Sequence, residues 1–335
     1  MNKNKNLCIC LGYESLVIPL NLINNEEEVI VYSNRLDILK FCKFQNIPFI
    51  KAPRVSIRDA SLYPKKVKKL IHHSLKNVNL NFFNIHIPHK MFGVHWIIFS
   101  LFSRSSKFYF HRTEIIDLES SIRLDIWPSE KAKSNIKNLI FNWFIFRLLI
   151  FFNFRILLTY RFYLGQLVPI VSDKWLRNRV ETITYQNKKK IFSPIYSKFK
   201  LDLPECKNLF LFTDIREMSN YIEEDSLVKI HEFILKQNVT VKGHPNRDFK
   251  SHISNKYPSF IPAELLINCT SNAVLALSSN TLRYASLNEK VKAISFIDLV
   301  TWKSSSHKNF FLDTLSEEDG IFFPQTYDEL RDLLQ

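Results

Sequence analysis

Glycine is scarce in this chain, with 5 among 335 residues, and the second half lacks the GxGxxG fingerprint of dinucleotide-binding folds. The 5 cysteines are odd in number and include no CxxC pair, which indicates neither a disulfide framework nor a zinc site. No helix-turn-helix spacing, zinc-finger spacing or aromatic RNA-binding signature is present, so we expect no nucleic-acid partner. The polar start MNKNKN precedes only a brief apolar run and predicts no secretory signal. The cytoplasm is therefore the expected compartment.

The composition is that of a globular protein, with 46% hydrophobic and 23% charged residues. The length is sufficient for two domains that each bury a core. The formal net charge of +14 favours anionic partners, and anionic lipid or acidic glycan fits at least as well as nucleic acid. An ordinary solvated basic surface is the alternative.

Short apolar runs alternate with helix-like segments in the first half, a pattern typical of a parallel, doubly wound sheet. The expected strands are 7–11, 29–32, 47–50, 81–87 and 107–110, with helices near 16–23 and 35–44. A polar stretch with two prolines, Tyr185 to Pro204, indicates the connection between domains. We therefore predict domains over residues 1–185 and 200–335.

The second half repeats the alternation and predicts a second Rossmann-like domain. Its expected strands are 209–212, 239–241, 273–277 and 291–296, and its expected helices lie near 226–237, after Pro262, after Ser279 and at 328–334. Polar residues follow these strands: Thr213 follows the first, Lys242-Gly243-His244-Pro245 the second, and Ser278-Ser279 the third. Ligands gather at the carboxyl ends of parallel strands, and phosphates at helix N-termini. This half therefore contains a candidate nucleotide site.

Each of these motifs also has a purely structural interpretation. A His-Pro pair after a strand is often only a turn, and a Ser-Ser pair is often only a helix N-cap. Lys242 adds positive charge or is only a surface lysine. Five other histidines, His86, His89, His95, His111 and His307, have no metal-ligand spacing, and we treat them as ordinary residues.

Two carboxylates follow the expected strand 107–110 and are candidates for a general base, because an α/β enzyme places such groups just past a strand end. They are Glu114 and Asp117. The alternative is that both only cap a helix or are exposed.

Two segments could bring the chain to a membrane surface. Pro64 to His73 carries four lysines among residues 65–69 and predicts a basic helix that contacts lipid or acceptor phosphate, or is simply solvated. Asn138 to Ile170 is highly apolar but is interrupted by Arg147, Arg155 and Arg161. Since a central arginine is costly in hydrocarbon, we expect helices that lie on a membrane or against the core; a true span is the least favoured reading.

The order of the motifs in the second half resembles bacterial sialyltransferases and polysialyltransferases of the GT-B type, which use CMP-sialic acid. The resemblance covers Leu209 to Phe296 and consists of His244-Pro245, the Pro262-Ala263-Glu264 helix start and Ser278-Ser279. The first half matches only in layout. The resemblance implies two Rossmann-like domains facing a central cleft.

The resemblance also implies roles for individual residues. His244 would contact the CMP phosphate and assist its departure, Ser278 and Ser279 would bind that phosphate, and Glu264 would hold the ribose hydroxyls. The families also carry an acidic pair followed by glycine as the source of the base, whereas this chain has His111-Arg112-Thr113-Glu114-Ile115-Ile116-Asp117. Either Glu114 or Asp117 has taken that role, or the donor, acceptor or activity differs.

With this resemblance, we expect an inverting, metal-independent glycosyltransferase without a cofactor. It would move sialic acid or a related nonulosonic acid from a CMP donor to a glycan or glycolipid, such as lipooligosaccharide or capsule. We expect it at the inner face of the cytoplasmic membrane as a peripheral protein. The alternatives are a CDP-glycerol or CDP-ribitol phosphotransferase of wall-polymer synthesis and a non-catalytic nucleotide-binding assembly protein.

Overall fold

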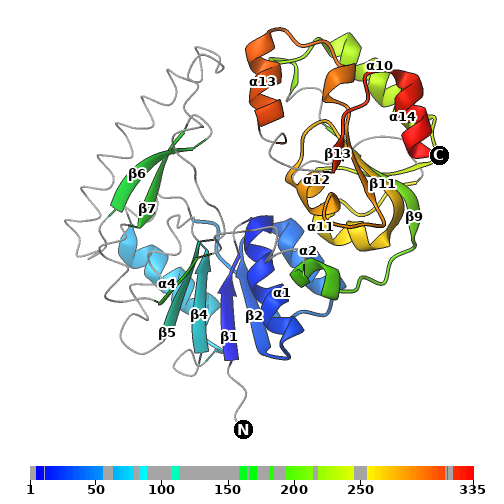
Figure 1. The fold of residues 1–335 in the computed structure, drawn as a ribbon. Coiled ribbons are helices and arrows are strands. Elements are labelled where there is room, and N and C mark those ends of the chain that lie inside the picture. The colour runs from blue at the N-terminus through cyan, green and yellow to red at the C-terminus, as the bar shows by residue number, and fades with distance from the viewer. Residues whose placement is uncertain are drawn as a thin grey trace. The chain divides into compact units, whose positions relative to one another are not determined.

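The structure, a computed structural model, describes residues 5–10, 12–55, 63–78, 83–88, 107–112, 158–163, 166–171, 181–184, 194–213, 218–244, 255–313, 315 and 320–335. The chain divides into two compact units, residues 1–188 (unit 1) and residues 189–335 (unit 2). Each unit is built around its own parallel sheet (Figure 1).

Unit 1 contains a six-stranded sheet in the order β3-β2-β1-β4-β5-β8, in which every neighbouring pair is parallel. The strands are β1 (Lys5–Ile9), β2 (Glu28–Ser33), β3 (Phe49–Lys51), β4 (Phe83–Pro88), β5 (Lys107–Arg112) and β8 (Glu181–Thr184). Counted along the sheet-forming strands, this is the 3-2-1-4-5-6 order of a doubly wound fold. The order reverses between β1 and β4, where ligands bind in folds of this kind.

Helices connect the strands of unit 1 and bury apolar residues against the sheet. Those in the described residues are α1 (Val17–Asn24), which follows the short 3-10 helix η1 (Tyr13–Leu16), α2 (Leu36–Phe44) and α4 (Pro64–Ser74). Val67 and Ile71 of α4 are buried and stand four positions apart, so that they share one face of the helix. The hydroxyls of Tyr32 on β2 and Ser74 on α4 lie 3.0 Å apart, which ties this helix to one face of the sheet.

Unit 2 contains a five-stranded parallel sheet in the order β10-β9-β11-β12-β13. The strands are β9 (Cys206–Leu211), β10 (Val239–Lys242), β11 (Thr270–Ala276), β12 (Lys292–Ser295) and β13 (Ile321–Phe322). This is the 2-1-3-4-5 order, the other common doubly wound arrangement, and it reverses between β9 and β11. Both units are therefore Rossmann-like α/β folds, which confirms the predicted fold class; the cleft between two domains stays a prediction.

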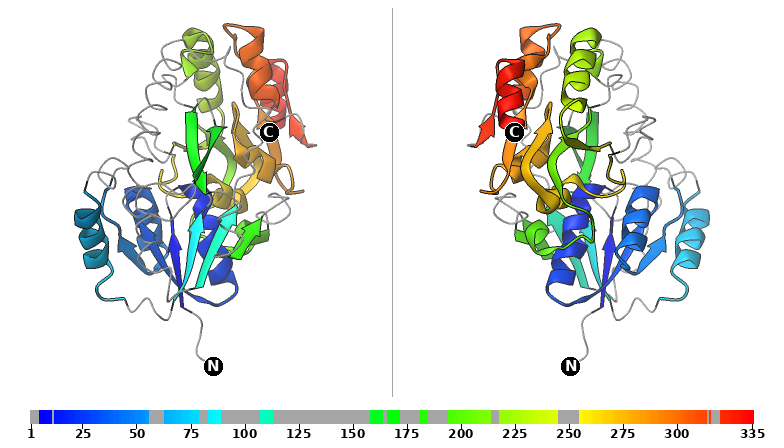
Figure 2. Two further views of the ribbon diagram at one scale, coloured as in Figure 1. Left: turned by 90° about the vertical axis from the view of Figure 1, so that its left-hand side faces the viewer. Right: turned by 90° about the vertical axis from the view of Figure 1, so that its right-hand side faces the viewer.

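Both faces of the unit 2 sheet are covered by helices (Figure 1 and Figure 2). Helices α10 (Glu224–Leu235) and α14 (Tyr327–Leu334) pack on the face that includes Phe210 and Leu275, and α11 (Ala263–Leu266) and α12 (Asn280–Ala285) on the face that includes Leu209 and Val274. The other described elements of unit 2 are helix 194–198, η4 (Ile267–Cys269), η5 (Ile297–Leu299) and α13 (Ser305–Asp313). Burial on both faces explains the near-continuous apolar runs of the strands.

The helical interpretation of Asn138 to Ile170 is wrong for its last part. Residues 158–163 and 166–171 form an antiparallel pair, β6 (Leu158–Tyr163) and β7 (Gln166–Val171), and residues 138–157 lie outside the described ranges. The physical reason is local: β6 and β7 are rich in aromatic and β-branched residues, which favour strands, and Pro169 removes a donor that a helix interior would need. In the described ranges, no helix combines the length and apolar character needed to cross a bilayer.

Candidate functional site

The candidate nucleotide-binding residues of unit 2 follow three adjacent strands, β10, β9 and β11. Thr213 comes two residues after β9, His244 two residues after β10, and Ser278 two residues after β11. The Phe212 N–H donates to the Lys242 carbonyl at 2.9 Å, so pairing between β9 and β10 continues to the end of both strands. These three segments, distant in sequence, therefore end at one edge of the sheet, where the strand order reverses.

Lys242 is a buried residue and not a surface lysine. Its side chain is 3% exposed, and its Nζ donates to the carbonyls of Gly243 at 2.6 Å and Ser259 at 2.9 Å. The ammonium group thus ties the end of β10 to the segment that precedes α11. His244, by contrast, is exposed, and Pro245 lies outside the described residues.

Ser279 is the N-cap of α12, as one of the two interpretations of the Ser-Ser pair predicts. Its backbone is extended, and its Oγ accepts a hydrogen bond from the Thr281 N–H at 3.2 Å. This satisfies one of the backbone donors that a helix start leaves without a partner. Ser278 and Ser279 are both half-buried, so their positions remain accessible to a ligand.

Glu264 on α11 lies beside the first turn of α12. Its Oε1 accepts a hydrogen bond from the hydroxyl of Thr281 at 3.3 Å, and Thr281 is buried. Burial and, to a lesser degree, the charge of Glu264 raise the pKa of the nearby Tyr284 phenol. The structure thus places Glu264 against Thr281, two residues after the Ser279 cap, although Glu264 and Thr281 come from different helices.

The base candidates Glu114 and Asp117 lie outside the described residues. The strand that precedes them is present as β5 and extends to Arg112, two residues beyond the expected end. The roles of both carboxylates stay predictions.

Unit 1 contains a pair of buried histidines that the spacing of histidines in the sequence did not predict. His86 Nδ1 and His111 Nε2 lie 2.9 Å apart across β4 and β5, and the two side chains are 5% and 4% exposed. Burial lowers the pKa of His86 to about 4; burial and then the neighbouring His86 lower that of His111 to about 3. Spacing along the chain could not reveal this pair, because it depends on the register in which Pro88 faces His111.

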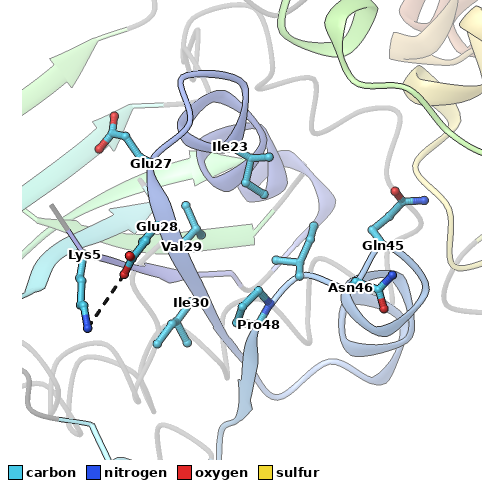
Figure 3. A pocket seen from close by; sticks show the side chains of 10 residues that line it. Lys5, Ile23, Glu27, Glu28, Val29, Ile30, Gln45, Asn46 and Pro48 are labelled. Carbon is cyan, nitrogen blue, oxygen red and sulfur yellow. Dashed lines mark ion pairs between the residues drawn. The ribbon is translucent and has the colours of Figure 1, made fainter. Parts of the chain in front are cut away.

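A pocket of about 490 Å³ lies at the amino-terminal edge of the unit 1 sheet, opposite the carboxyl edge of the same sheet (Figure 3). It includes the first residues of β1 and β2 and the residue just before β3, namely Lys5, Glu28 and Pro48. Figure 3 shows the carboxylate of Glu27 directed away from the other residues that line the pocket. Because ligands of doubly wound folds bind at the carboxyl edge, we do not place the reaction here.

In the described ranges, no three His, Cys, Asp or Glu residues lie together in a way that could hold a metal ion. All five cysteines are free and buried. Metal independence stays a prediction.

No protein-family model matches this chain, and no curated protein matches it in sequence. Similar solved structures include a glycotransferase of kitacinnamycin, 8% identical, with 99% of this chain and 89% of that chain covered and a TM-score of 0.46. The spinosyn forosaminyltransferase SpnP is 10% identical, with 100% and 91% covered and a TM-score of 0.46. A UDP-GlcNAc 2-epimerase from Methanocaldococcus jannaschii is 12% identical, with 98% and 91% covered and a TM-score of 0.45. Because these likenesses are weak, we assign the fold from the two strand orders alone.

Proposed function

We propose that this chain is a glycosyltransferase that binds a CMP-linked nonulosonic acid, such as CMP-sialic acid, at the carboxyl edge of unit 2. The observation that supports this most is that Thr213, His244 and Ser278 follow adjacent strands at the carboxyl edge of the sheet, beside its reversal point. Glu264 is hydrogen-bonded to Thr281 in the helix that Ser279 caps. Every motif that the resemblance implies and the structure describes belongs to this edge or to the helix start beside it.

In the proposed reaction, the bond between the anomeric carbon of the sugar and the CMP phosphate oxygen breaks. An acceptor hydroxyl forms the new bond to that carbon, and its proton goes to Glu114 or Asp117. His244, which is exposed, is able to donate a hydrogen bond to the departing phosphate, with the hydroxyls of Ser278 and Ser279 as further donors. Donors that are fixed before the reaction stabilise the charge that develops on the phosphate.

Glu264 and Lys242 have different roles in this scheme. Glu264 would accept hydrogen bonds from the ribose hydroxyls while Thr281 orients its carboxylate. Lys242 would act by holding the His244 turn, since both carbonyls to which its Nζ donates belong to the surrounding loops. Its buried charge adds to the attraction for phosphate.

The decisive experiment measures CMP binding by calorimetry and CMP release from CMP-sialic acid with a glycan acceptor. We expect His244→Ala to lower the release rate by roughly 10²- to 10³-fold, the range for loss of one donor to a developing anion. His73→Ala is the matched control, because His73 is an exposed histidine on α4 in unit 1. Equal rates for the two variants would remove the proposed role of His244.

The same assay separates the other candidate functions. Release of CMP from CDP-glycerol or CDP-ribitol, but not from CMP-sialic acid, would identify a phosphotransferase instead. Binding of CMP without turnover on any donor and acceptor would identify a nucleotide-binding assembly protein.

We also propose that α4 brings the enzyme to the anionic inner face of the cytoplasmic membrane. Lys65, Lys66 and Lys69 are exposed on this helix, next to the exposed Leu70, and its first turn contains no acidic residue. Each lysine near an anionic surface contributes about 1 kcal/mol, so three lysines would change the affinity for vesicles by roughly 100-fold. The apolar side chain of Leu70 would insert between headgroups.

Sedimentation with phosphatidylglycerol-containing vesicles tests this attachment. Replacing Lys65, Lys66 and Lys69 by Gln should abolish most binding, whereas the same change at the exposed Lys229, Lys236 and Lys290 of unit 2 should leave it intact. High salt should release the wild-type protein, because it screens charges at the surface. Equal binding to neutral phosphatidylcholine vesicles would contradict the electrostatic attachment.

A further inference from the structure

Hydrogen bonds join the elements around the candidate nucleotide site of unit 2. Lys242, at the end of β10, donates through its Nζ to the carbonyl of Ser259, in the segment before α11. The hydroxyl of Thr281 on α12 donates to Glu264 Oε1 on α11 at 3.3 Å, and the Thr281 N–H donates to Ser279 Oγ at 3.2 Å. Thr281 therefore contacts two of the candidate ligand-binding side chains, Glu264 and Ser279.

The Thr281 hydroxyl depends on Glu264, because Thr281 is 2% exposed. A buried hydroxyl that has no acceptor destabilises the fold. The Glu264 carboxylate has only acceptor oxygens, so the hydroxyl is the donor of this contact. The core thus directs one donor at one oxygen of the carboxylate.

The two helices that carry this pair share an apolar core. Leu266 of α11 and Leu282 and Ala285 of α12 are fully buried in the same cluster. Glu264 itself is half-buried, so a ligand can reach its carboxylate. A side chain on a fixed helix, restrained further by a buried donor, has few orientations available before a ligand binds.

The orientation of this carboxylate matters for the recognition of a ribose. The 2′ and 3′ hydroxyls of a ribose are two adjacent donors, and a carboxylate can accept hydrogen bonds from both when its plane faces them. A dideoxyribose has neither hydroxyl. A correctly oriented Glu264 therefore favours ribonucleotides, without any effect on the base or the phosphate.

We propose that Thr281 is a positioning residue that makes the site selective for ribonucleotides, by holding the Glu264 carboxylate in the orientation that accepts from the 2′ and 3′ hydroxyls. This inference rests on the proposed function, which supplies the nucleotide and the role of Glu264. Thr281 acts through Glu264 and does not contact the nucleotide. Its hydroxyl, and not its methyl group, has this role.

Calorimetric titration with CMP and with 2′,3′-dideoxy-CMP measures the selectivity, because these ligands differ only in the two ribose hydroxyls. Thr281→Val replaces the hydroxyl by a methyl group and retains the N–H that donates to Ser279. We expect the Kd for CMP to rise roughly 10-fold, an effect of the size of one hydrogen bond to a charged group. The Kd for dideoxy-CMP should be unchanged.

Thr270→Val is the matched control. Thr270 is also buried, and its hydroxyl donates to the Leu266 carbonyl at 2.9 Å, but it is the first residue of β11, at the amino edge of the sheet. This variant loses a buried hydroxyl at the opposite end of the strand. We expect both Kd values to stay as in the wild-type protein.

A second pair of variants separates the hydroxyl from the methyl group and decides the question if the valine variant does not fold. Thr281→Ser and Thr281→Ala both lose the methyl group and differ only in the hydroxyl. The ratio of the Kd for dideoxy-CMP to the Kd for CMP should stay near the wild-type value in Thr281→Ser and fall in Thr281→Ala. In a Glu264→Ala background, Thr281→Val should not weaken CMP binding further, because the side chain through which it acts is gone.

An unchanged ratio in both Thr281→Val and Thr281→Ala would overturn the positioning role. Equal losses of affinity for the two ligands would also overturn it, since they indicate general damage to α12. If the wild-type protein bound both ligands equally, Glu264 would not recognise the ribose and the inference would fail with that assignment. A wild-type protein that bound neither ligand would instead remove the proposed nucleotide site, so the two failures are distinguishable.

Discussion

The two units bury histidine in opposite ways. In unit 1, His86 and His111 are hydrogen-bonded to each other and, through Asn6, to Glu27. In unit 2, His231 on α10 is 4% exposed, and neither of its ring nitrogens has a hydrogen-bond partner among the described residues. The centroid of its ring lies 4.5 Å from the ring centroid of Phe212 and 5.4 Å from that of Phe210.

This difference separates two effects of a buried polar ring. A buried imidazole with partners selects one arrangement of its neighbours, whereas one without partners mainly costs desolvation. Burial lowers the pKa of His231 to about 4, as it does that of His86, so the pKa alone does not distinguish the two cases. Only the hydrogen bonds distinguish them, and three substitutions test this contrast.

The largest effect should come from replacing Asn6, which joins Glu27 to His86 by hydrogen bonds in unit 1. Asn6→Leu leaves the Nε2–H of His86 buried without an acceptor and removes the partner of Glu27. We expect the free energy of unfolding to fall by about 3 kcal/mol, the upper part of the range for an unsatisfied buried group. Chemical denaturation measures this change, with Asn25→Leu at an exposed position as control.

A smaller and opposite effect is expected for His231→Leu, which should raise the free energy of unfolding by about 1–2 kcal/mol at neutral pH. Leucine has a similar volume and no polar atom that lacks a partner, and Phe210, Phe212 and Phe296 surround the site. A loss of stability in this variant would show that the imidazole has a compensating interaction, such as an internal water.

The same variant should also change the pH dependence of stability. The pKa of His231 is about 4 in the folded state and about 6.5 when unfolded, so the unfolded state binds the proton more tightly. The free energy of unfolding is therefore highest above pH 6.5 and decreases as the pH falls toward 4. Protonation of His231 accounts for roughly 3 kcal/mol of this decrease. The decrease should be shallower in His231→Leu, and parallel curves for both proteins would contradict the assigned pKa.

The smallest effect is expected at Glu27, the partly exposed residue that accepts the hydrogen bond of Asn6. Glu27→Gln replaces a charge-assisted hydrogen bond from Asn6 with a neutral one, and we expect a loss of about 0.5–1 kcal/mol. Glu28→Gln is the matched control, because Glu28 is exposed and its oxygen lies 4.0 Å from Lys5 Nζ. If Glu27→Gln lowered the free energy of unfolding as much as Asn6→Leu, the Glu27 carboxylate, and not the Asn6 amide, would be the main support of these hydrogen bonds.

Much of the fold could be predicted because local patterns indicate it. The runs that became β2, β5, β9 and β11 are short and apolar, and turn or helix residues follow them, so both alternating units were visible in the sequence. The antiparallel pair β6 and β7 was missed, because aromatic and arginine-rich apolar segments do not distinguish a strand from a helix by periodicity alone.

The candidate site shows the same limit. The His-Pro and Ser-Ser motifs could be located because they follow strands, and Ser279 could be expected to be an N-cap. The burial of Lys242 and the bond between Glu264 and Thr281 could not, since they depend on how loops and helices meet at the sheet edge.

Hydrophobic spacing and turn residues act over a few neighbours, so the alternating α/β units and the polar motifs at the strand ends could be read from the sequence. Which of those residues lie near one another depends on the tertiary structure. Strand order brought Thr213, His244 and Ser278 to one edge, and strand register placed His86 against His111. Register and strand order follow from the packing of whole sheets, in which each contact joins residues far apart in the chain.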